Sequence, residues 1–99
     1  MTSIERTDSE LTIRTSPRFD FAACEQLQVA FERELATGFS SLTVDLSNTV
    51  YIDSAALGML LYMDHVSGEN LHARIVGARG QVLDAIRTMH LDNVLDVVI

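Results

Sequence analysis

The hydrophobic pattern of this chain switches repeatedly between a two-residue period and a helical period, and this alternation limits the folds it can adopt. Apolar and polar residues alternate over 41–47 (SLTVDLS), which predicts a strand that we expect to be central. Stretches with helical spacing lie on either side of it, at 21–37 and 54–66. Strands that alternate with helices favour an α/β fold.

The rest of the chain supplies further short elements of the same kinds. Segments 3–6 and 11–15 read as two strands joined by a turn, and Pro17 ends the second because it cannot donate to a ladder. Residues 50–52 form an extended piece, 72–78 another strand, and 94–99 an edge strand or a truncated last element. A third helix is expected over about 81–90, with Val82, Ile86 and Met89 on one face. We therefore predict one α/β domain over 1–99, with a mixed sheet of four to five strands and helices packed on it.

Small polar residues mark where the two longer helices begin. Asp20 is expected to cap the helix that starts at Phe21, and Asp53 or Ser54 the helix that starts at Ser54. Gly38 is expected to end the first helix, and Cys24 lies on its inner stripe as a buried thiol.

Charge and composition restrict the partners and the compartment. The 99 residues carry a net charge of −7, so we expect no binding to nucleic acid or anionic lipid and a preference for a partner with a basic face. The N-terminal segment has no apolar region typical of a signal peptide, and no apolar run is long enough to span a membrane. With a single cysteine and no internal disulfide, the chain is expected in the cytoplasm.

The sequence offers little for catalysis or for a cofactor. The loop 76–82 (VGARGQV) lacks the third glycine of a dinucleotide fingerprint and the ending of a P-loop. His65, His72 and His90 have no metal-ligand spacing, and Ser54 lacks the Gly-x-Ser-x-Gly elbow. We expect no enzyme activity, no cofactor and no metal site.

The helix that begins at Ser54 has two apolar faces, which is unusual for a helix that only covers a sheet. One face is expected to pack on the sheet, and it comprises Ala56, Met59, Leu60, Met63 and Val66. The other comprises Ser54, Gly58, Leu61, Tyr62 and His65, with no charged residue before Asp64. Either another element buries this second face, or it binds a partner protein. Glycine inside a helix costs ~1 kcal/mol relative to alanine, so Gly58 suggests a close approach at that point.

Ser54 also lies where a phosphate would be stabilised. Free N–H groups and the positive end of the helix dipole favour a phosphoryl group at a helix N-terminus. Its charge of about −1.5 to −2 would stand beside Asp53 at the rim of the apolar face and would expel a partner docked there.

Three segments together resemble a known family, the STAS domains of anti-sigma factor antagonists. They are LTVDLSNTVYIDSAALGMLL, SPRFDF, and ARIVGARGQVLDAIRTMHLDNVLDV. The resemblance implies a mixed sheet with helices packed on it. It also implies that Ser54 is phosphorylated by a partner that is both anti-sigma factor and serine kinase, that the unphosphorylated form captures this partner, and that a serine phosphatase restores binding. Ala55 and Ala56 depart from the family pattern of Ser or Thr and then Gly, which leaves Ser54 as the one hydroxyl in the motif.

These observations predict a non-enzymatic phospho-switch protein in bacterial partner switching. The expected partner-binding residues are Asp20, Asp53, Ser54, Ala55, Gly58, Leu61, Tyr62 and His65. One alternative is a STAS regulatory module of a transporter complex or of a sensory scaffold, without phosphorylation. A second is a ligand-binding domain that uses the loop 77–80.

Overall fold

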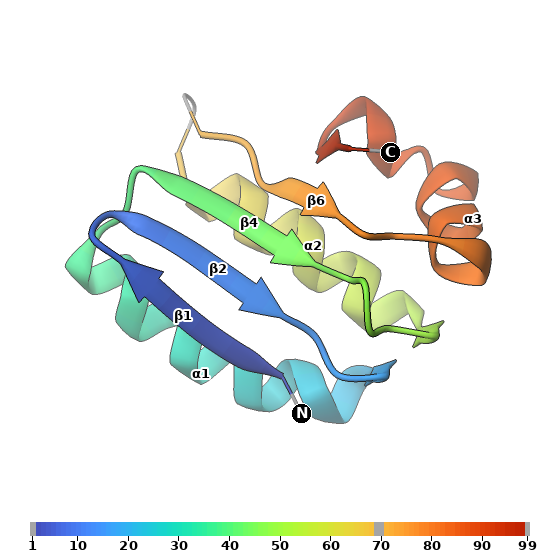
Figure 1. Cartoon of the computed structure of the whole chain (residues 1–99), viewed down its shortest axis with the longest axis horizontal. Coiled ribbons are helices and arrows are strands. Elements are labelled where there is room, and N and C mark those ends of the chain that lie inside the picture. The colour runs from blue at the N-terminus through green and yellow to red at the C-terminus, as the bar shows by residue number, and fades with distance from the viewer. Residues whose placement is uncertain (1, 69–70, 99) are drawn as a thin grey trace.

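A five-stranded mixed sheet organises the chain, and the computed structural model describes it over residues 2–68 and 71–98 (Figure 1). Its strands are β1 (Ser3–Thr7), β2 (Glu10–Arg14), β4 (Ser41–Asp45), β6 (Arg74–Val76) and β7 (Asp96–Val97), in the order β1-β2-β4-β6-β7. β1 and β2 pair antiparallel, and the other neighbours pair parallel. The predicted α/β class and mixed sheet are confirmed, with β4 central and β7 at an edge. The strand expected over 72–78 is shorter, since only three of its residues pair.

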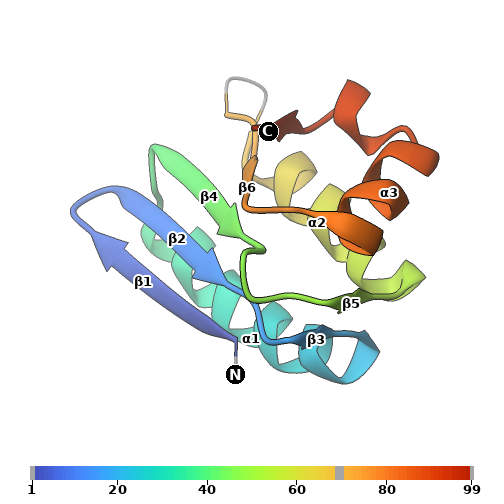
Figure 2. The ribbon, with the colours of Figure 1, turned by 45° about the vertical axis from the view of Figure 1, so that its right-hand side comes forward.

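A second, two-stranded sheet lies beyond the ends of β2 and β4 and was not predicted as a sheet (Figure 2). β3 (Arg18–Phe19) pairs parallel with β5 (Tyr51–Ile52), which is the piece expected to be extended. Pro17 ends the hairpin strand, but its carbonyl still accepts from the N–H groups of Val50 and Tyr51 at 2.9 and 3.1 Å. This small sheet leads directly into the two long helices.

The helices are α1 (Phe21–Thr37), α2 (Ser54–Val66) and α3 (Gly80–Thr88), with a 3-10 turn η1 (Leu91–Asn93) after them. α1 and α2 lie behind the large sheet in Figure 1 and leave its other face uncovered. The bounds of α1 and α2 match the predicted ranges. The expected position of Met89 on the buried face of α3 is wrong, because the helix ends at Thr88 and Met89 is 58% exposed.

The core fills the space between the sheet and the helices. Its side chains come from alternate positions of β2, β4 and β6, namely Leu11, Ile13, Leu42, Val44 and Ile75, and from α1 and α2. Cys24, Leu27 and Phe31 supply the stripe of α1, while Leu35 is only partly buried. The apolar faces of β2, β4 and α1 therefore point toward the core, as the sequence predicted.

Two contacts fix the loops around β6. Gly77 has φ +77°, and a Cβ at this position would lie 2.8 Å from the backbone nitrogen of Ser47. Glycine at position 77 is therefore explained by the backbone conformation and by the close approach of Ser47. On the other side of β6, the buried carboxylate of Asp64 accepts from the Ala73 N–H at 2.7 Å and lies 3.5 Å from Nδ1 of His72. This acid joins the end of α2 to the start of β6.

Candidate functional site

The first turns of α1 and α2 lie side by side, and one carboxylate links them. Asp53 precedes α2 with extended backbone, and its Oδ1 accepts from the Ala56 N–H at 2.9 Å. Its Oδ2 accepts from the N–H of Phe21, the first residue of α1, at 3.0 Å. The sequence analysis expected either Asp53 or Ser54 as the N-cap of this helix, and the structure shows that the cap is Asp53. The same carboxylate also holds α1 beside α2.

Asp20 plays the corresponding part for α1. Its Oδ1 accepts from the Ala23 N–H at 3.1 Å, and its Oδ2 accepts from Nε of Arg18 at 3.2 Å. The Ala23 N–H lowers the pKa of Asp20, and the Arg18 guanidinium adds to this effect. Both acids at this end of the molecule are thus engaged in hydrogen bonds within the chain.

Ser54 is the first residue of α2 and is exposed. Because Asp53 provides the cap, the Ser54 hydroxyl is not needed for it, and among the described residues it has no hydrogen-bond partner. Ala55 beside it is partly buried, whereas the Ala56 methyl is fully buried and faces the core. The alanine at position 56 therefore does not alter the outer surface around Ser54.

The outward face of α2 is the one predicted from helical spacing. Gly58, Leu61 and His65 are exposed, with Leu61 at 36%, and Tyr62 is partly buried. A Cβ on Gly58 would meet nothing within 4 Å, so no part of the described chain approaches this glycine closely. His65 lies about 16 Å along the helix from Ser54, too far to activate its hydroxyl. Within the described residues, this face remains open.

A groove separates α1 from α2 next to Ser54, and no pattern in the sequence predicted its α1 side. Phe21 and Gln28 of α1 form one wall, and Ala55, Gly58 and Tyr62 of α2 form the other. Cys24 and Met59 lie at the floor, and the volume is about 250 Å³. Phe21 is 62% exposed although it is a large aromatic residue.

The Cys24 thiol at this floor is held in its neutral form. Burial raises its pKa to about 11, and the charges of Asp53 and Asp20 act in the same direction. Tyr62, on the wall, has its pKa raised by desolvation and by the neighbouring Glu32 carboxylate, which accepts from the Tyr62 hydroxyl at 3.3 Å. The groove is therefore apolar at its floor, with the Asp53 and Asp20 carboxylates near one end and the Glu32 carboxylate near the other.

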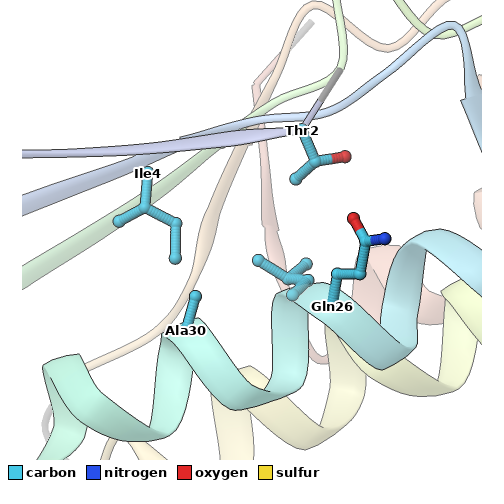
Figure 3. Close-up of a pocket in the computed structure, with 5 residues that line it drawn as sticks. Thr2, Ile4, Gln26 and Ala30 are labelled. Atoms are coloured by element: carbon cyan, nitrogen blue, oxygen red, sulfur yellow. The ribbon is translucent and has the colours of Figure 1, made fainter.

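Another hollow lies on the opposite flank of α1, under the edge strand β1 (Figure 3). Its lining comprises Thr2, Ile4, Gln26, Leu27 and Ala30, and its volume is about 300 Å³. It shares no lining residue with the groove beside Ser54.

Across the described ranges, no group of three or more His, Cys, Asp or Glu side chains is placed to hold a metal ion. Nor does any helix in the described part have the length and apolar character needed to cross a membrane.

Comparisons with known proteins identify a family and a set of solved structures that share this fold. Residues 2–98 match the family described as "Mlab, STAS domain". A STAS-domain containing protein of Pseudomonas aeruginosa strain UCBPP-PA14 is 36% identical over 89 residues, which cover 89% of this chain and 87% of that protein.

Solved structures share the fold at lower identity. An anti-sigma factor antagonist from Mycobacterium paratuberculosis is similar with a TM-score of 0.82 and 21% identity, over 98% of this chain and 83% of that one. The Bacillus cell fate determinant SpoIIAA in its phosphorylated form is similar with a TM-score of 0.74 and 12% identity, over 100% of this chain and 92% of that one.

Proposed function

This chain belongs to the STAS domain family, and from that premise we propose that it is a non-enzymatic switch protein controlled by phosphorylation of Ser54. Unphosphorylated, it captures a regulator that is both anti-sigma factor and serine kinase. Phosphorylated, it releases that regulator, and a serine phosphatase reverses the change. The structural similarity to an anti-sigma factor antagonist and to SpoIIAA in its phosphorylated form supports this proposal.

The observation that carries the proposal is the position of Ser54. Its hydroxyl is exposed at the start of α2, and the cap of that helix is provided by Asp53 instead. A kinase can therefore reach the oxygen without opening the fold. In the transfer, Ser54 Oγ bonds to the γ-phosphorus of ATP, the bond from that phosphorus to the β,γ-bridging oxygen breaks, and ADP leaves. The hydroxyl proton passes to a base of the kinase.

Phosphorylation then changes the surface more than the fold. The phosphate adds a charge of about −1.5 to −2. Because only part of the first-turn N–H groups of α2 are used by Asp53, the remainder and the helix dipole favour the new charge. A partner packed against Ala55 and Gly58 would have to desolvate that charge, which is costly. Release thus follows from the cost of desolvating the phosphate, without unfolding.

Phosphate mapping with purified serine kinases from the source organism tests the proposal. Each kinase is incubated with the protein, ATP and Mg²⁺, and the phosphorylated residue is identified by mass spectrometry. We expect phosphate at Ser54, kinase capture by Ser54→Ala, and loss of capture by Ser54→Asp. Ser40→Ala, which removes another exposed serine, is the control and should behave as wild type.

Two other results would point away from the switch. If Ser54→Asp binds the partner as tightly as wild type, the chain is a STAS module that acts without phosphorylation, as in a transporter complex or a sensory scaffold. If phosphate appears on another residue while Ser54 stays unmodified, the assignment of the switch to Ser54 is wrong.

A further inference from the structure

The groove between α1 and α2 has a size and lining that suit one large side chain from a partner. Its volume of about 250 Å³ is below the ~300–1,000 Å³ of sites that enclose cofactors and small-molecule ligands. Its two helical walls open directly beside Ser54 through Ala55 and Gly58.

We infer that this groove receives an apolar anchor residue from an amphipathic helix of the partner, with a basic residue of that helix directed toward Glu32. This inference rests on the proposed function, because it describes the partner of the same site. It goes further in assigning α1, through Phe21 and Gln28, a direct part in recognition.

The apolar anchor follows from the lining. Phe21 exposes 62% of its surface at one wall, and the floor consists of the Cys24 and Met59 side chains. The thiol stays neutral, so the floor offers no charge to a ligand. Large aromatic side chains beside a small apolar hollow are typical of the centres of protein interfaces.

Gly58 adds an independent argument. Its Cβ position is empty, and nothing in the described chain lies within 4 Å of it. The fold therefore gains nothing from this glycine, although an alanine there would favour the helix. A partner side chain that packs against the exposed backbone at Gly58 would explain why this position lacks a side chain.

The direction of the partner helix follows from charge. At the Ser54 end, the Asp53 and Asp20 carboxylates each cap the N-terminus of a helix, so backbone N–H groups and the positive end of the helix dipole offset their charge. At the other end, Glu32 accepts only from the neutral groups of Tyr62 and Gln28, and within the described residues it forms no ion pair. The negative charge that neither a cation nor a helix N-terminus offsets thus lies at the Tyr62 end, which favours a cation there and an apolar contact next to Ser54.

Synthetic helical peptides test this inference without requiring the natural partner. The probes have ~16 residues, enough to form a helix, and carry a central Leu with an Arg one turn away. Matched peptides replace the Leu by Ala or the Arg by Glu. Binding to ¹⁵N-labelled protein is followed by amide chemical shifts. We expect shifts centred on Phe21, Gln28 and Gly58, with affinity about tenfold weaker for the Ala peptide.

Variants of the protein give the matching evidence. Gly58→Leu should fill the groove and weaken the Leu–Arg peptide by at least about tenfold. Ala30→Leu, placed in the separate hollow of Figure 3, should leave its affinity unchanged. Glu32→Gln should weaken it about threefold, whereas Glu25→Gln on the same helix should not. Thermal unfolding by circular dichroism verifies that each variant is folded.

The outcomes separate this inference from the switch itself. Equal affinity for the Leu and Ala peptides, shifts confined to another surface, or unchanged binding by Gly58→Leu would overturn the groove assignment while leaving phosphorylation of Ser54 standing. If the peptides bind as expected but no kinase modifies Ser54, the groove is a docking site and only the switch is refuted.

Discussion

Replacement of Asp53 provides the sharpest test of how the two helices are joined. Its carboxylate makes two bonds to two different helices, to Ala56 at 2.9 Å and to Phe21 at 3.0 Å. Loss of an N-cap costs about 1 kcal/mol. The second bond has a charged acceptor but lies at the surface, so we assign it about 1 kcal/mol, the typical value for an ordinary hydrogen bond, and not the larger value of a bond to a charged group. Asp53→Ala should therefore lower the free energy of unfolding by about 2 kcal/mol.

Asp20 is the matched control, because it caps α1 but does not bridge to α2. Asp20→Ala should cost about 1 kcal/mol, since its pair with Arg18 is exposed and contributes little. Asp53→Asn keeps an oxygen for Ala56 but loses the acceptor for Phe21, so its stability should fall midway between wild type and Asp53→Ala. Urea unfolding followed by far-UV circular dichroism measures all three. If Asp20→Ala costs as much as Asp53→Ala, the bridging bond contributes nothing and the reasoning fails.

Three further predictions concern the stability of the domain and the residues Gly77, Asp64 and Cys24. Gly77→Ala should destabilise the domain by more than about 2 kcal/mol, because a positive φ and a contact with Ser47 coincide there, and a thermal melt that matches wild type would contradict this. Asp64→Ala should cost about 1–3 kcal/mol, since the buried Ala73 N–H loses its acceptor, and hydrogen exchange at Ala73 should rise with it. Cys24 should make stability fall between pH 9 and 11: the folded pKa of about 11 lies above the ordinary 9.0, so the unfolded chain loses its proton first. The loss is on the order of 2 kcal/mol. The free energy of unfolding, measured with urea at several pH values across this range, should therefore fall less steeply with pH for Cys24→Ala than for wild type. The chain contains no lysine, and its tyrosines are the same in both proteins, so the difference reports Cys24.

Much of the fold can be predicted from patterns among residues that are close together in the sequence. Asp20 and Asp53 stand before helical apolar periods, and the two-residue alternation over 41–45 identifies the central strand. These patterns involve residues within a few positions of one another, so a single sequence reveals them. The outward face of α2 was likewise predictable from helical spacing.

Features that depend on how elements meet were not predictable. The Asp53–Phe21 bond joins residues 32 positions apart, and the α1 wall of the groove exists only because α1 packs against α2. Asp64 is buried because the segment that leads into β6 packs against it, and the apolar spacing of α2 carries no information about the position of that segment. β3 has two residues, too few to show a period.

Under the proposed function, the division of roles between Asp53 and Ser54 lets the start of a helix carry a phosphate while the cap of that helix stays in place. If Ser54 were the cap, phosphorylation would remove the acceptor that holds the first turn. Instead Asp53 caps α2 through the Ala56 N–H and binds α1 through the Phe21 N–H, so we expect the walls of the groove to keep their positions when Ser54 is phosphorylated. Under the proposed function, phosphorylation therefore changes the charge at the rim of a fixed groove, and the partner responds to that charge and not to a rearranged fold.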